Sequence, residues 1–149
     1  MATALNLTLP LKQDADSLAA LQRFVETFAE EVQPVLEAKL AESEVVHFAR
    51  LLVIDWRYLQ VLTEFDTDPV AYTDFFLQEL SEVLERIFSL VEGVPPWERL
   101  SDPVTFFTQM QRFNVRALGR STDGNVTEGY LFSALGDTTV RETLVRTRV

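Results

Sequence analysis

Residues 45–65 read VVHFARLLVIDWRYLQVLTEF, and this stretch decides the fold because two apolar runs flank a short connector. Large and β-branched side chains dominate residues 45–54, whereas apolar and polar side chains alternate over residues 59–65. Both patterns are typical of strands, and the connector from Asp55 to Arg57 is short enough for a tight turn. The stretch therefore predicts an antiparallel β-hairpin.

The register of this hairpin decides which side chains share a face of the sheet, because a slip of one residue moves every side chain to the opposite face. If Ile54 lies opposite Tyr58, Arg50 lies on the open face and His47 points toward the helices. If Ile54 lies opposite Leu59, Arg50 enters the most apolar face. Burying an unpaired guanidinium beneath helices is costly, whereas a neutral imidazole at a strand end is tolerated. We therefore expect the first register.

Leucines alternate with other residues over positions 5–11, which predicts a further half-buried strand. Pro10 cannot donate a ladder hydrogen bond, so this strand lies at an edge or ends there. Candidate N-cap residues at 14–17 precede large apolar residues at helical spacing. We expect the helix that follows to kink or end at Pro34.

Two Asp-Pro pairs, at residues 68–69 and 102–103, each combine an N-cap with a proline at the first helical position. The first pair predicts a long helix that runs to about residue 91, and the second predicts a shorter helix that runs through residue 113. Residues 119–129 are mostly polar and include several glycines, which predicts an exposed loop.

Residues 130–135 predict a last strand, and Thr139 with Glu142 forms a capping-box pattern that predicts a terminal helix. The order of elements is then βαββαβ, with extra helices near 103–113 and at the C-terminus. This order is typical of a ferredoxin-like α+β fold, a four-stranded antiparallel sheet with helices on one face. No linker composition interrupts the chain, so we expect a single domain over residues 1–149.

The element order resembles that of the dimeric α+β barrel superfamily, in which two such sheets meet through their open faces. This resemblance is one of topology only, and it implies a homodimer. Members range from cofactor-free monooxygenases and haem enzymes to simple ligand binders, so the resemblance assigns no activity. Residues 47–50 and 64–66, followed by Tyr72, look like a family signature, although no named family with an established activity follows from them.

The composition excludes several classes of function. The 23 acidic and 13 basic residues leave a net charge of −10, which argues against a nucleic-acid or acidic-membrane partner. The absence of cysteine excludes disulfides and cysteine-ligated metals, and a single histidine excludes a multi-histidine metal site within one chain. No secretory signal opens the chain, and no apolar run approaches the ~18 residues that span a bilayer, so we expect a cytoplasmic protein.

The open face of the predicted sheet collects the candidate ligand-binding residues Arg50, Tyr58, Gln60 and Glu64. Arg50 is suited to hold a carboxylate or another anion through two parallel hydrogen bonds. The other three residues would then orient the bound molecule. The alternative is a structural ion pair between Arg50 and Glu64 across neighbouring strands.

His47 is the candidate catalytic residue, because it alone titrates near neutrality without a large shift. It is suited to act as a general base or as a haem ligand, although a lone histidine in a strand can also be purely structural. Asp66, Asp68 and Asp74 suggest a hard-metal site, but their loop lacks calcium-ligand spacing and Asp68 already serves as a helix cap. We therefore predict no metal site.

These observations favour a homodimer that binds a small, partly apolar or acidic molecule on its open sheet face. One alternative is an oxidoreductase, either cofactor-independent or haem-dependent, in which His47 is catalytic. A further alternative is a structural or interaction protein without a ligand site. The sequence does not identify a cofactor.

Overall fold

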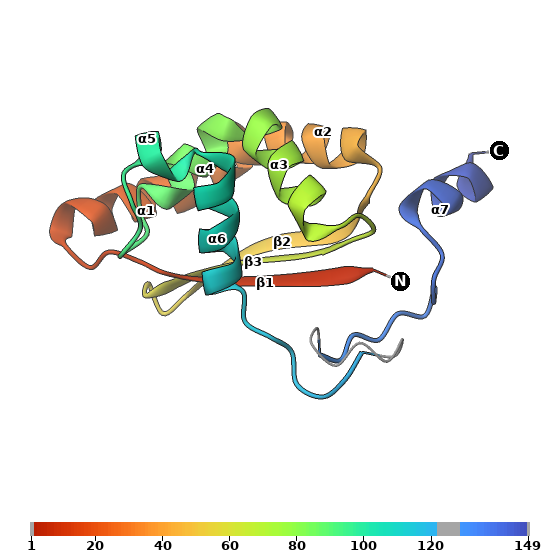
Figure 1. Cartoon of the computed structure of the whole chain (residues 1–149). Helices are drawn as coiled ribbons and strands as arrows, with labels where there is room; N and C mark the ends of the chain where they lie inside the picture. The colour runs from red at the N-terminus through yellow and green to blue at the C-terminus, as the bar shows by residue number, and fades with distance from the viewer. Residues whose placement is uncertain (1, 122–128, 149) are drawn as a thin grey trace.

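The computed structural model describes residues 2–121 and 129–148, whose strands form one antiparallel three-stranded sheet in the order β1-β3-β2. The strands are β1 (Thr3–Pro10), β2 (Val46–Ile54) and β3 (Tyr58–Phe65). The helices are α1 (Ala15–Thr27), the π-helical η1 (Phe28–Val32), α2 (Gln33–Ser43), α3 (Pro69–Glu79), α4 (Ser81–Phe88), α5 (Trp97–Leu100), α6 (Pro103–Phe113) and α7 (Val140–Thr147). Helices α1 to α6 lie on one side of the sheet (Figure 1). The prediction of an α+β protein is confirmed.

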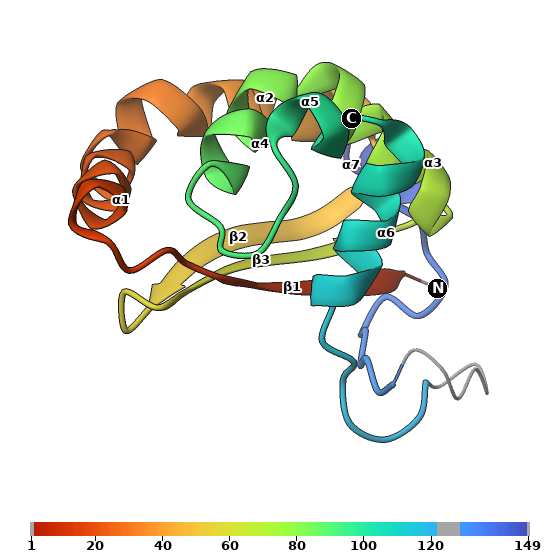
Figure 2. The same ribbon diagram turned by 60° about the vertical axis from the view of Figure 1, so that its left-hand side comes forward.

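The predicted hairpin register is also confirmed, because Ile54 lies opposite Tyr58. Alternate residues of each strand face the helices, and on β1 and β3 these include the fully buried Leu9 and Leu59. The opposite face of the sheet, which we call the open face, is turned away from helices α1 to α6 (Figure 2). It carries Arg50, which pairs with Leu62 of β3. The core therefore lies between one face of the sheet and the helices.

The predicted four-stranded ferredoxin-like sheet is wrong, because residues 130–135 form no strand. A fourth strand of that fold would lie beside β1, where other groups already bind. Val115 N–H donates to Asn6 O (2.9 Å), and Asn6 N–H donates to the Asn114 side-chain oxygen (2.8 Å). Asn114 also forms an isolated bridge with Leu7. The chain leaving α6 therefore occupies the edge that the fourth strand would need.

The helix boundaries follow the local signals closely. Asp68 and Asp102 each cap a helix as predicted, Asp14 is the cap among the candidates at 14–17, and Thr139 with Glu142 forms the predicted capping box. The long helix predicted to reach residue 91 is instead broken at Leu80 into α3 and α4. The predicted loop at 119–129 lies partly outside the described residues.

Pro34 changes the winding of the first helix rather than ending it. Because proline lacks an N–H and its ring crowds the carbonyl four residues earlier, an undistorted α-helix is strained there. The turn before it is π-helical, with Gln33 N–H donating to Phe28 O. This wider turn lets α1, η1 and α2 follow one another along the sheet.

The hairpin turn contains the most unusual backbone of the described chain. Asp55 and Trp56 have φ values of 53° and 55°, and Arg57 N–H donates to Ile54 O at 3.0 Å. Positive φ at both central residues is typical of a type I′ turn, for which Asn-Gly is the favoured sequence. A tryptophan at the second position is therefore strained by its Cβ atom.

We expect Trp56→Gly to stabilise the protein relative to Trp56→Ala by about 1 kcal/mol, because both lose the indole but only glycine relieves the strained φ. Chemical denaturation followed by circular dichroism measures the difference. An alanine variant at least as stable as the glycine variant would contradict a strained turn.

Candidate functional site

A groove runs between α2 and the outer side of β2, and we call it the β2 groove. Its volume is about 510 Å³. Leu36 and Leu40 contribute apolar side chains from α2, and Ala49 and Leu51 contribute them from β2. The polar or charged residues at its wall are Gln33, Glu37, His47 and Arg50. Two of the predicted site residues, His47 and Arg50, therefore line the same groove.

A β-bulge positions His47. Val46 pairs with Phe65 and Phe48 pairs with Glu64, which leaves His47 as an extra residue on β2. The extra residue removes His47 from the strict alternation of the strand, and its side chain meets the residue that follows β3. The bulge therefore lets His47 contact Asp66 while Ile54 stays opposite Tyr58.

His47 and Asp66 form a close pair in which Nε2 lies 2.5 Å from Oδ1. Their side chains are only 9% and 11% exposed. An ionised Asp66 selects the tautomer in which Nε2 carries the proton and donates it, so Nδ1 of a neutral His47 is left as an acceptor. Among the described residues, Nδ1 of His47 has no hydrogen-bond partner. The pair can thus orient an imidazole base.

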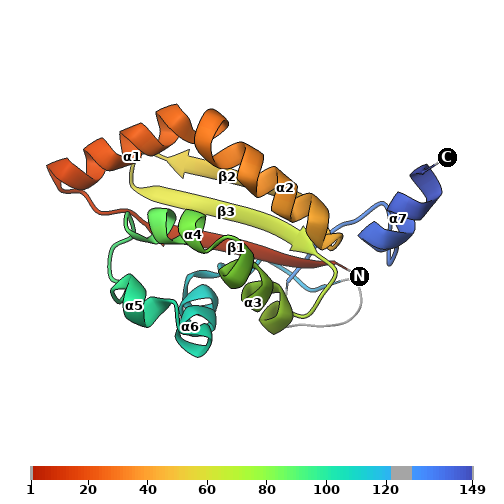
Figure 3. The ribbon, with the colours of Figure 1, turned by 90° about the horizontal axis from the view of Figure 1, so that it is seen from above.

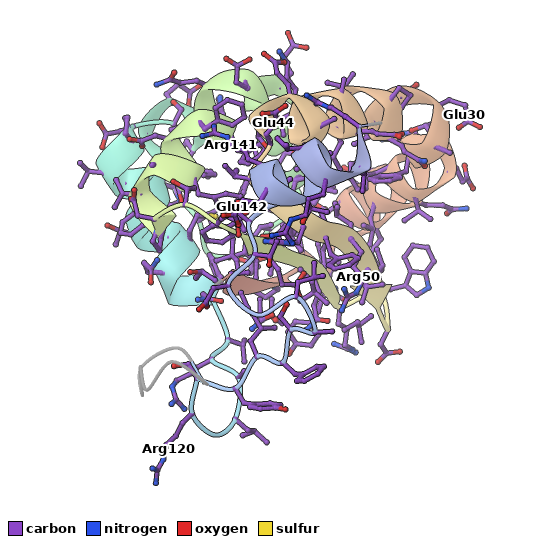
Figure 4. All side chains as sticks on the ribbon, turned by 90° about the vertical axis from the view of Figure 1, so that its right-hand side faces the viewer. Glu30, Glu44, Arg50, Arg120, Arg141 and Glu142 are labelled. Atoms are coloured by element: carbon purple, nitrogen blue, oxygen red, sulfur yellow. The ribbon has the colours of Figure 1, made fainter. Side chains whose placement is uncertain are left out.

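Asp66 also holds the C-terminal helix. Its Oδ2 accepts a hydrogen bond of 2.7 Å from the N–H of Val140, the first residue of α7. A carboxylate at a helix N-terminus is favourable because it meets the positive end of the helix dipole. Glu44 lies 3.9 Å from Arg141 and 3.3 Å from Arg148, on the side of α7 that faces α2 (Figure 4). No residue of α7 is buried, so polar contacts dominate its attachment.

Arg50 is exposed on the open face, opposite Leu62 of β3. It forms no hydrogen bond or ion pair with another residue in the described part of the chain. Glu64 lies opposite Phe48, and its Oε2 is buried without a hydrogen-bond partner. The ion pair between Arg50 and Glu64, considered as a structural alternative, is not formed. Figure 4 shows Arg50 apart from the Glu44 and Arg141 contact.

The remaining predicted site residues lie on the open face outside the β2 groove. Tyr58 is exposed opposite Ile54. Gln60 turns toward β1 and donates to the Thr8 hydroxyl at 3.2 Å. The structure therefore brings His47 and Arg50 to one groove and leaves Tyr58, Gln60 and Glu64 beside it on β3.

A smaller cavity of about 90 Å³ lies inside the core, between the sheet and helices α2, α3, α4 and α6. Its walls are almost entirely apolar, and a void of this kind stays dry. One polar pair is buried at its wall, where the Tyr72 hydroxyl donates to Thr63 Oγ1 at 2.9 Å. Burial raises the pKa of Tyr72 to about 12, opposed by the hydrogen bond to Thr63 and assisted by the charge of Glu64.

Sequence reasoning missed the role of Asp66 as the partner of His47 and of α7, because the register that it favoured places His47 and Asp66 on opposite faces of the sheet. The structure supports no metal site, since the described residues contain no group of three acidic or histidine side chains placed to hold a metal. The sequence did contain a signal for the contact with Asp66, because residues 47–50, residues 64–66 and Tyr72 together looked like one family signature. These segments converge, because Tyr72 also stacks on Phe65 with ring centroids 3.9 Å apart.

No protein-family model matches the chain, and no curated protein or solved structure matches it either. The resemblance to dimeric α+β barrels thus has no support from related proteins. In the described residues, no helix is both long and apolar enough to cross a membrane.

We expect Asp66→Asn to loosen α7, because the amide cannot hold both His47 and the helix N-terminus as an anion does. The free energy of unfolding should fall by about 1–3 kcal/mol, as expected for a buried hydrogen-bonded charge. Amide exchange in α7 should quicken more than exchange in β1. Asp74→Asn in α3 is the matched control. If both variants changed stability and α7 exchange equally, Asp66 would not hold α7.

Tyr72 should make stability depend on alkaline pH. Its raised pKa means that the contribution is complete below pH 10 and is lost as pH rises toward 12, when the buried hydroxyl ionises. The loss should amount to about 2–3 kcal/mol. Unfolding measured between pH 9 and 12 should show a shallower decline for Tyr72→Phe than for the wild type, and parallel declines would contradict the assignment.

Proposed function

We propose that the protein binds a small, partly apolar molecule with an anionic group, and that Arg50 anchors the anion at the β2 groove. The unpartnered guanidinium of Arg50 on an apolar strand carries this proposal. Arginine offers a planar fork of donors that matches a carboxylate or a phosphate. A chain with a net charge of −10 does not attract anions as a whole, so a local cation must supply the selectivity.

The groove fits the apolar part of such a molecule. Its volume of about 510 Å³ falls within the range of roughly 300–1,000 Å³ common for small-molecule sites. Leu36, Leu40 and Leu51 offer an apolar wall to the body of the ligand. The proposal keeps the ligand class and the anchor expected from the sequence, and it moves the body of the ligand from the middle of the open face to its β2 edge.

A homodimer belongs to the same proposal. Phe48, Leu52, Ile54 and Tyr58 all lie on the open face with more than 40% of their surface exposed. Neighbouring exposed apolar side chains of this kind mark an interaction surface. A second copy that contacts β2 would remove part of this apolar surface from water.

The His47–Asp66 pair favours a second candidate function, catalysis of proton transfer from a molecule held by Arg50. A histidine that lines a groove and is oriented by a carboxylate is suited to general-base chemistry. A haem-dependent oxidoreductase is less well supported by the geometry, because Nε2 is already paired with Asp66. A haem absorbance band of the purified protein that disappears in His47→Ala would favour that version.

Octanoate and octan-1-ol, which share an apolar chain and differ in charge, provide a direct test. In NMR titrations we expect octanoate to shift amide resonances of β2 and α2 and to bind more tightly than the alcohol. Arg50→Gln should weaken octanoate binding about tenfold or more, as expected for a lost charge-assisted hydrogen bond. Arg57→Gln, which removes an exposed arginine at the hairpin tip, is the control. Equal weakening by both variants, or no preference for the acid, would overturn the proposal.

A further inference from the structure

No strand of the described chain pairs with the outer edge of β2. With nine residues, β2 is the longest strand, and it is the richest in large apolar side chains. Seen from above, α1 and α2 cross this side of the sheet, and β2 ends the sheet beneath them (Figure 3). No residue of β2 is buried, whereas Leu9 on β1 and Leu59 on β3 are 0% and 1% exposed. The core is therefore incompletely covered along β2.

The direction of the free backbone groups on β2 follows from the hairpin turn. Ile54 O accepts the turn hydrogen bond from Arg57, so the peptide groups of Ile54 point toward β3. Because these groups alternate along a strand, those of Ala49, Leu51 and Val53 point away from the sheet. An unpaired row of this kind is a ready template for another strand.

The two edges of the sheet are treated differently. The β1 edge ends in Pro10 and is covered near Asn6 by Asn114 and Val115. The β2 edge has a bulge only at its start and a single permanent charge, Arg50. Natural proteins protect free edges with prolines, bulges and inward charges, and the straight part of β2 lacks such protection.

We propose that β2 pairs with β2 of a second copy of this chain, antiparallel about a two-fold axis through Leu51, so that the two sheets become one. This inference depends on the homodimer of the proposed function and not on its ligand. In this register Leu51 lies opposite itself, and Ala49 lies opposite Val53 of the partner. All of the outward-facing groups of the straight part of β2 are then paired.

Other two-fold registers are less favourable. Centring the axis on Arg50 places two guanidinium groups directly opposite one another, which is destabilising. Centring it on Leu52 leaves Ala49 opposite a turn residue, Asp55 of the second copy. The Leu51 register instead places Arg50 opposite Leu52 and Phe48 opposite Ile54. Only this register combines full backbone pairing with apolar contacts and no directly opposed like charges.

Charge favours contact along β2 over other contacts between two copies of this acidic chain. Residues 45–54 contain no carboxylate, although the chain has 23 acidic residues. Two molecules that each carry a charge of −10 therefore approach along β2 with less repulsion than along an acidic surface. Pairing would also cover the half-buried Leu51 and Val53 and bring a second wall to the β2 groove.

Cysteine cross-linking of the full chain tests the register, because the natural sequence contains no cysteine. Hydrogen-bonded residues directly opposite one another have Cα atoms about 5.5 Å apart, within the roughly 4.4–6.8 Å of a disulfide. Under mild oxidation Leu51→Cys should form a covalent dimer, and Ala49→Cys and Val53→Cys should each form no covalent dimer on their own. A mixture of the latter two should cross-link. If Ala49→Cys alone cross-linked as much as Leu51→Cys, or if Arg50→Cys or Leu52→Cys cross-linked more than Leu51→Cys, this register would be overturned.

Sedimentation of the uncrosslinked protein tests the interface independently. The wild type should dimerise reversibly, and open-ended oligomers or a monomer at all concentrations would overturn the proposal. Leu52→Lys, placed opposite Arg50 of the partner, should weaken the dimer about tenfold or more, whereas Leu52→Glu should strengthen it. Val104→Lys and Val104→Glu, on an exposed position of α6, correct for net charge. If Leu52→Lys and Leu52→Glu both weakened or both strengthened the dimer, the interface would be contradicted. The octanoate titration tests the ligand site separately.

Discussion

The pairing of β3 with both of its neighbours is the constraint on which the rest of the structure depends. β3 lies between β1 and β2, so its register with each strand decides which side chains meet the helices. Leu59 packs into the core from this central position, and Thr63 receives the hydroxyl of Tyr72 there. The same registers send Arg50 to the open face, where it can act as a cation accessible to solvent and ligands.

The bulge at the start of β2 connects this sheet to the chemistry of the site. One extra residue brings His47 to Asp66, and Asp66 in turn holds the first turn of α7. A single carboxylate thus binds both the imidazole of His47 and the N-terminus of α7. Any movement of α7 would alter the surroundings of His47, because both contacts share that carboxylate.

The two edges of the sheet differ, because other residues cover part of the β1 edge and no strand of the described chain covers the β2 edge. Asn114 and Val115 bind the backbone of Asn6 at the β1 edge, where a fourth strand would otherwise pair. The outward-facing backbone groups of β2 pair with no strand of the described chain, none of its residues is buried, and the β2 groove lies along it. The cation at Arg50, the His47–Asp66 pair and the unpaired edge of β2 therefore lie on the same side of the fold, which is why we propose both a ligand site and a dimer contact there.

Local signals in the sequence were sufficient for the hairpin, its register and the helix caps at Asp14, Asp68 and Asp102. These features depend on alternation, desolvation and hydrogen bonds between near neighbours, and such forces act over a few residues. The fourth strand was wrongly predicted because the competition for the β1 edge involves Asn114, more than a hundred residues from Asn6. The bulge at His47 and the role of Asp66 escaped detection because residue spacing does not reveal an extra residue in a ladder. The sequence by itself thus determined the α+β class, the hairpin and the candidate residues His47 and Arg50. Only the tertiary structure decided which edge is closed and which carboxylate meets the histidine, because both depend on contacts between segments far apart in the chain.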